Sequence, residues 1–126
     1  MEPQFGYLDP LTERVIGAIF EVSNTLGAGF MEKVYQRALV AELRLRGIKA
    51  DSETALTVIY KGKSVGDYFA DIIVEDLLVL ELKCVDKLAP EHTAQCLNYL
   101  KASGLRLCLL VNFHHPKVEW KRVMFD

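Results

Sequence analysis

The feature that most constrains the fold is a run from Leu77 to Cys84 that is apolar except for Glu81 and Lys83. A strand with so few polar positions is typical of the centre of a sheet that is covered on both faces. Together with the helices and strands expected elsewhere in the sequence, the run predicts the α/β class. A charged pair in a central strand is costly to bury, and a buried carboxylate normally has a partner or a metal ion.

This strand is the second half of a predicted hairpin. Apolar β-forming residues flank a short acidic break at residues 75–77, which indicates strands at Tyr68–Val74 and Leu78–Cys84 joined by a tight turn. We expect the turn to centre on Asp76, and that centre fixes which residues of the two strands face each other.

The hairpin brings three charged side chains onto one small surface. The register places Asp71 opposite Glu81, with Cβ atoms about 5 Å apart, and the alternation of side chains puts Lys83 on the same face as Glu81. Facing carboxylates destabilise a sheet unless a positive charge lies between them, and a divalent cation with oxygen ligands supplies one. The surface is therefore either a solvated polar face of a ribbon or a cation site.

The remaining elements follow from helical and alternating periodicity and from glycine and proline at the breaks. We expect helices at Leu8–Thr25, Phe30–Arg46 and Pro90–Ser103, and further strands at Glu53–Tyr60, Ser64–Val74, Leu105–Phe113 and Val118–Phe125. The strand after the third helix should lie parallel to Leu78–Cys84 by a right-handed crossover, which makes the sheet mixed. We interpret residues 1–126 as one domain, with a loose lead-in at Met1–Tyr7.

Composition limits the possible locations and partners. No run approaches the roughly 18 apolar residues of a membrane span, and the N-terminus has no basic region like that of a signal peptide, so we expect a cytoplasmic protein without a membrane partner. A net charge of −2 argues against a general basic nucleic-acid binder but leaves room for a local patch. Cys84, Cys96 and Cys108 lie in apolar segments, which favours buried free thiols over disulfides or an iron–sulfur cluster.

Two helices carry weaker candidate positions. Glu32 and Tyr35 are three residues apart and share a face of the second helix, although an acid in a first turn also interacts favourably with the helix dipole alone. Gln95 and Tyr99 are four residues apart on the third helix, where such a pair is commonly a surface hydrogen bond.

Taken in order, these residues resemble the PD-(D/E)xK nuclease superfamily. The resemblance rests on Asp71, then Glu81-Leu-Lys83 on the next strand, then Gln95-xxx-Tyr99 on the following helix. The stretch Gly29-xx-Glu32-xx-Tyr35 resembles the small GxxExxY family within that superfamily. The resemblance implies a restriction-endonuclease-like core, with a mixed β-sheet flanked by helices in the order ααβββαββ.

The resemblance also implies roles and ligands. The predicted function is hydrolysis of DNA phosphodiester bonds with Mg²⁺ or Mn²⁺. The ion would be held by oxygen ligands from Asp71, Glu81, the backbone carbonyl of Leu82 and Glu32. Lys83 would orient or deprotonate the attacking water or stabilise the charge of the transition state. Gln95, Tyr99 and Tyr35 would contact nucleic acid or support catalysis.

Two departures keep a second interpretation open. The residue before Asp71 is Ala70, where the superfamily name has proline, and that position contributes no ligand. The chain is little more than a catalytic core, so we expect recognition of a target to come from a homodimer or a protein partner, or to be weak. Lys87, Lys101 and Arg106 are further candidates for phosphate contacts near the site. The alternative is a catalytically silent nuclease-fold domain that serves as a nucleic-acid-binding or protein-interaction module.

Overall fold

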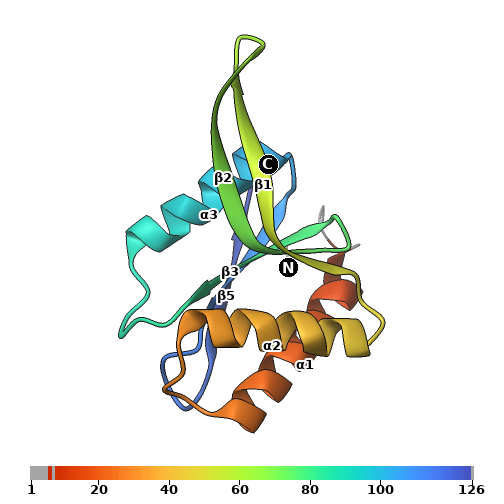
Figure 1. Cartoon of the computed structure of the whole chain (residues 1–126), viewed down its shortest axis with the longest axis vertical. Helices are drawn as coiled ribbons and strands as arrows, with labels where there is room; N and C mark the ends of the chain where they lie inside the picture. Colours follow the sequence, from red (N-terminus) through yellow and green to blue (C-terminus); the bar gives the residue numbers. More distant parts are fainter. Residues whose placement is uncertain (1–5, 7, 126) are drawn as a thin grey trace.

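The structure is a computed structural model that describes residue 6 and residues 8–125. The predicted lead-in at residues 1–7 lies outside the described residues, apart from Gly6. The elements follow one another as predicted (Figure 1). They are α1 (Asp9–Leu26), α2 (Glu32–Leu45), β1 (Ala50–Tyr60), β2 (Lys63–Val74), β3 (Leu78–Lys83), α3 (Pro90–Ser103), β4 (Leu107–Asn112) and β5 (Glu119–Met124).

The five strands form one mixed sheet in the order β1-β2-β3-β4-β5. β3 and β4 are parallel, as predicted for strands joined through α3, and the other neighbours are antiparallel. β3 is central and almost wholly buried, which agrees with its apolar sequence. The order ααβββαββ and the mixed sheet confirm the predicted restriction-endonuclease-like fold.

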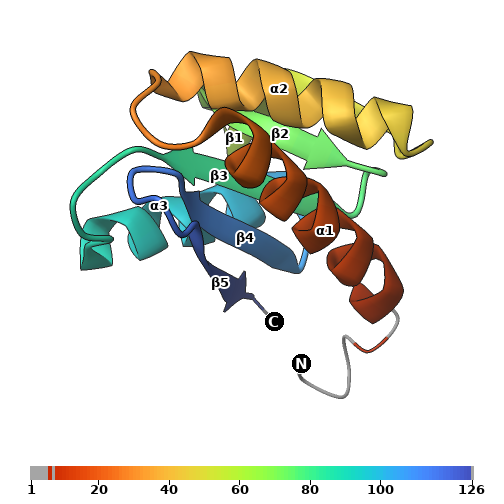
Figure 2. The same ribbon diagram turned by 90° about the horizontal axis from the view of Figure 1, so that it is seen from below.

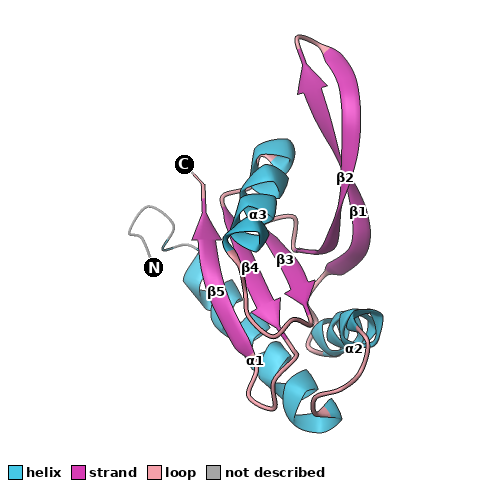
Figure 3. Ribbon diagram, turned by 90° about the vertical axis from the view of Figure 1, so that its left-hand side faces the viewer, coloured by secondary structure: helices cyan, strands magenta, loops and turns pink. Residues whose placement is uncertain are grey.

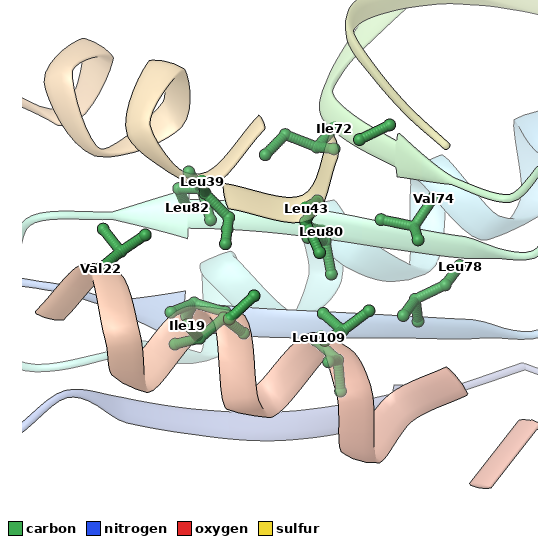
Figure 4. Close-up of a cluster of buried hydrophobic side chains, with 14 of the residues drawn as sticks. Ile19, Val22, Leu39, Leu43, Ile72, Val74, Leu78, Leu80, Leu82 and Leu109 are labelled. Carbon is green, nitrogen blue, oxygen red and sulfur yellow. The ribbon is translucent and has the colours of Figure 1, made fainter. Parts of the chain in front are cut away.

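Helices cover both faces of the sheet (Figure 2). α1 and α2 lie on one face, where their apolar side chains meet those of the sheet, and α3 covers the other face. Figure 4 shows the first of these cores, formed by Ile19, Val22, Leu39, Leu43, Ile72, Val74, Leu78, Leu80, Leu82 and Leu109. Alternation along β3 sends Leu80 and Leu82 into this core and Val79 into the core under α3. Glu81 therefore points to the α3 side of the sheet.

The hairpin of β1 and β2 projects beyond the rest of the sheet (Figure 3). Residues 61–69 are all exposed, and burial on β2 begins at Ala70. β2 pairs with β3 over only three residue pairs, from Val74 and Leu78 to Ile72 and Leu80. The turn that joins them has both Glu75 and Asp76 in the left-handed region, with φ of 53° and 56°, as in the tight turns that match the twist of a hairpin.

Two further expectations can be compared with the structure. Among the described residues, none of the helices is long and apolar enough to cross a membrane. The three cysteines are free thiols, and Cys96 and Cys108 are buried as predicted, whereas Cys84 is only partly buried.

Candidate active site

The two predicted carboxylates meet where β2 separates from β3. The register is the predicted one, but the ladder ends at Ile72 and Leu80, one pair before Asp71 and Glu81. Asp71 instead accepts a hydrogen bond through Oδ2 from the backbone N–H of Leu82, at 2.8 Å. Its carboxylate thus satisfies a strand N–H group and remains beside Glu81.

Among these side chains, Glu81 is the one whose charged form is least favoured by its surroundings. Only 3% of the residue is exposed, and its Oε2 atom is buried without a hydrogen-bond partner. Burial, together with the neighbouring Asp71 carboxyl, raises the pKa of Glu81 from 4.5 to about 10. The surroundings of Glu81 therefore favour its protonated, uncharged form.

Lys83 lies on the same side of β3 as Glu81, as predicted. Its Nζ atom is 3.9 Å from Oε1 of Glu81, and its side chain is largely buried. The backbone carbonyl of Lys83 accepts a hydrogen bond from the N–H of Phe113, which fixes the end of β3 against β4. The amine therefore lies within ion-pairing distance of Glu81, on a strand whose end is tied to β4.

Glu32 approaches the carboxylates from the first turn of α2. It lines a cavity of about 280 Å³ together with Gln36, Asp71 and Leu82. Partial burial and the charge of Asp71 raise the pKa of Glu32, and Lys83 opposes this rise. Even so, no three His, Cys, Asp or Glu side chains of the described residues are arranged as a ready metal-binding group. The structure therefore brings Glu32 near the pair without completing a cluster of three acids.

The donor set nevertheless fits a divalent cation. The buried Oε2 atom of Glu81 lacks a partner, and the carboxylate of Asp71 lies beside Glu81. Hard cations such as Mg²⁺ and Mn²⁺ prefer carboxylate and carbonyl oxygens, and a positive charge here would offset the burial and the repulsion from Asp71 that raise the pKa of Glu81.

Gln95 and Tyr99 form the predicted pair on α3. The Nε2 group of Gln95 donates a hydrogen bond of 3.0 Å to the hydroxyl of Tyr99. Tyr99 is 5% exposed, and burial followed by the proximity of Glu81 raises the pKa of its hydroxyl. The pair therefore reaches the site from the α3 side, and the ring of Tyr68 contacts Tyr99 edge-on with centroids 5.9 Å apart.

Tyr35 has a different position from that expected of a nucleic-acid contact. Its side chain is fully buried and stacks on Phe113, with ring centroids 4.6 Å apart. Its hydroxyl donates to the carbonyl of Gly27 at 2.6 Å and accepts from the N–H of Phe30 at 3.3 Å. Tyr35 thus anchors the loop before α2, in which Gly29 has a φ of 109° that favours glycine.

The candidate phosphate contacts are dispersed. Arg106 comes directly before Leu107, the first residue of β4, which pairs with Leu78. The level of the candidate site on β4 is marked by Leu110, which lies opposite Glu81. Four residues of strand separate Arg106 from that level, about 13 Å along β4, so a phosphate contact by Arg106 would lie that far from the carboxylates. Lys101 lines a separate cavity between α3 and the hairpin.

Sequence reasoning missed two buried amides. Gln36 donates to the backbone carbonyl of Asp71 at 2.9 Å and so links α2 to that residue of β2. Asn112 is fully buried and bonds both the carbonyl and the N–H of Val85, at 2.8 and 3.1 Å, which holds the segment after Lys83. Their partners lie 35 and 27 residues away in the sequence, so no local pattern marks them.

Comparisons with known proteins agree with this geometry. A family model described as the PD-(D/E)XK nuclease superfamily matches residues 9–123. No curated protein matches the chain. The crystal structure of a protein called SSO0001 has the same fold, with a TM-score of 0.58 and 21% identity over 95% of this chain. The match covers 61% of SSO0001, which is less than two thirds of that protein.

The match of the family model spans nearly all of the described residues. The chain therefore belongs to the PD-(D/E)XK nuclease superfamily.

Proposed function

We propose that the protein is a nuclease that hydrolyses DNA phosphodiester bonds with Mg²⁺ or Mn²⁺, and that it is a member of the GxxExxY family. The observation that carries this proposal is the buried, partnerless Oε2 atom of Glu81 beside Asp71, with Nζ of Lys83 3.9 Å from the other carboxylate oxygen, Oε1. A protein-interaction module has no chemical need for a lysine beside paired carboxylates.

Each residue has a role that its surroundings support. Asp71, Glu81 and the carbonyl of Leu82 are the proposed ligands, and Glu32 at the cavity wall is the third acid. A divalent cation bound there would supply Lewis acidity and lower the pKa of a water molecule. Lys83 donates hydrogen bonds to the attacking water or to the phosphoryl oxygens on which negative charge develops.

The α3 side supports the lysine and the substrate. Tyr99 is held by Gln95 and lies against Glu81, so its hydroxyl restricts the position of the carboxylate. Because Tyr35 is buried, its proposed support is indirect and acts through the loop before Glu32. A cytoplasmic location, a single domain, and targeting by a homodimer or protein partner belong to the same proposal.

The test combines metal binding with cleavage. Calorimetric titration with Mg²⁺ and Mn²⁺ should show binding by the wild type and by Lys83→Ala but not by Glu81→Ala. Incubation with linear, single-stranded and branched DNA should show cleavage by the wild type only. Lys49→Ala is the matched control, because Lys49 pairs with Asp76 at the opposite end of β3 and should leave both properties unchanged.

The outcomes separate the two functional interpretations. No metal binding at millimolar concentration would refute the catalytic proposal and leave the silent module. Cleavage that survives Lys83→Ala would show that the lysine has no part in the reaction.

A further inference from the structure

The cavity beside Asp71 adjoins a second hollow along α2. The first has a volume of about 280 Å³ and the second, between α2 and β1, about 330 Å³. Both are lined by Lys33 and Gln36. The two cavities therefore adjoin each other along α2, and together they are here called the α2 groove.

The outer part of the α2 groove carries an excess of positive charge. Lys33, Arg37 and Arg44 line it, whereas Glu53 of β1 is the acid there. This local excess occurs in a chain whose net charge is −2, and the acids Glu32 and Asp71 line the inner part. Offsets of 4 and 11 residues place all three cations on the same side of the helix.

The three cations differ in the partners that they already have within the protein. Arg44 donates from Nε and Nη2 to the carbonyl of Ala50, which holds its guanidinium against β1. Lys33 forms an ion pair with Glu53. Within residues 8–125, Arg37 has no carboxylate partner within 4 Å, so its guanidinium is available to an anion.

We propose that the α2 groove binds the sugar-phosphate backbone of the nucleic-acid strand that enters the candidate active site. This inference rests on the proposed function, because it assigns a path to the substrate of the same site. Lys33 and Arg37 lie one helical turn apart, with Cβ atoms about 6 Å from each other, and both can contact one strand. Such contacts fix the position of the strand and carry no sequence information.

Glu53 gives the proposal a directional test. Its carboxylate is exposed and forms an ion pair with the ammonium group of Lys33. The carboxylate therefore competes with a phosphate for that ammonium group. Neutralising Glu53 should therefore strengthen binding, whereas neutralising Arg37 should weaken it. Any polyanion-binding surface would respond in these same two directions, so the location of the strand is tested by comparing Arg37→Ala with the removal of an equal charge elsewhere on the protein.

The experiment measures binding without cleavage. Fluorescence anisotropy in EDTA is recorded with labelled single-stranded DNA, with duplex DNA and with inorganic polyphosphate as competitor, at several salt concentrations. The variants are Arg37→Ala, Arg37→Lys, Glu53→Gln, Lys101→Ala and the control Lys121→Ala. Lys121 is an exposed lysine on β5, at the opposite edge of the sheet from β1.

Losing one phosphate contact should reduce the salt slope by about 0.7 to 0.9 and the affinity at 0.1 M salt by about five- to eightfold. We expect that loss for Arg37→Ala, partial recovery for Arg37→Lys, tighter binding for Glu53→Gln and no change for Lys121→Ala. Polyphosphate should compete with the wild type more strongly than with Arg37→Ala.

Three results would overturn the inference. The first is equal affinity of Arg37→Ala and Lys121→Ala for DNA. The second is a loss of affinity for Lys101→Ala alone, which would move the strand to the α3 side. The third is no DNA binding by the wild type. A separate cleavage assay with Mg²⁺ keeps the two proposals apart. Arg37-dependent binding without cleavage supports the groove and opposes the nuclease, whereas cleavage that is indifferent to Arg37 does the reverse.

Discussion

Replacing Glu81 by glutamine should stabilise the metal-free protein, and the gain should grow with pH. The carboxyl is buried beside Asp71, and one of its oxygens has no hydrogen-bond partner. Glutamine has nearly the same shape but no charge to desolvate, so it removes the repulsion while it preserves the packing. The variant would thus lose the proposed metal site and gain stability.

The sign of the pH dependence follows from the direction of the shift. The pKa of Glu81 is raised from 4.5 to about 10 on folding, so above pH 4.5 the unfolded chain releases a proton that the folded chain retains. Stability is fully present below pH 4.5 and falls as pH rises towards 10, by about 1.4 kcal/mol per pH unit. Between pH 5 and pH 7 the loss amounts to about 2.5 kcal/mol.

Urea unfolding in EDTA at pH 5, 6 and 7 measures this difference. The free energy of unfolding of Glu81→Gln minus that of the wild type should increase by about 2.5 kcal/mol across the range. Glu13→Gln on the exposed surface of α1 is the control and should stay within about 0.5 kcal/mol of the wild type. A difference that is constant with pH, or a variant less stable than the wild type at pH 7, would refute the reasoning.

Three further predictions concern the surroundings of the site. Mg²⁺ at ten times its dissociation constant should raise the free energy of unfolding by about 1.4 kcal/mol in the wild type and leave Asp71→Asn unchanged, as thermal melts would show. Tyr35→Phe removes the hydrogen bonds to Gly27 and Phe30 and should lower stability by about 1.5 kcal/mol in urea titrations, an expectation that an unchanged midpoint would contradict. Asn112→Ala leaves both backbone groups of Val85 without their partner and should lower stability by about 3 kcal/mol, and a loss below 1 kcal/mol would show that water replaces the amide.

The topology could be predicted because each element of the core carries its own local signal. The apolar run of β3 places it at the centre of the sheet, and the acidic break fixes the register of β2 and β3. That register, with the alternation of side chains, is enough to bring Asp71, Glu81 and Lys83 together. Local pattern therefore accounts for the part of the candidate site that lies on adjacent strands.

The features that the sequence does not resolve depend on packing between distant elements. Glu32 and Tyr35 are three residues apart, but Glu32 lines the cavity beside Asp71, whereas Tyr35 lies over Phe113 in the core. Helical spacing alone does not distinguish these environments. Gln36 is similar, because its amide is recognisable only once β2 has been placed beneath α2.

The ladder between β2 and β3 ends one pair before Asp71, so the candidate site lies where the two strands separate. Beyond this point the outer residues of the hairpin are exposed. Asp71 nevertheless stays attached to both neighbours, because its carboxylate accepts a hydrogen bond from the N–H of Leu82 and its carbonyl accepts one from Gln36. The position of this proposed ligand is therefore set by bonds to β3 and α2, and changes in the outer hairpin should leave it in place.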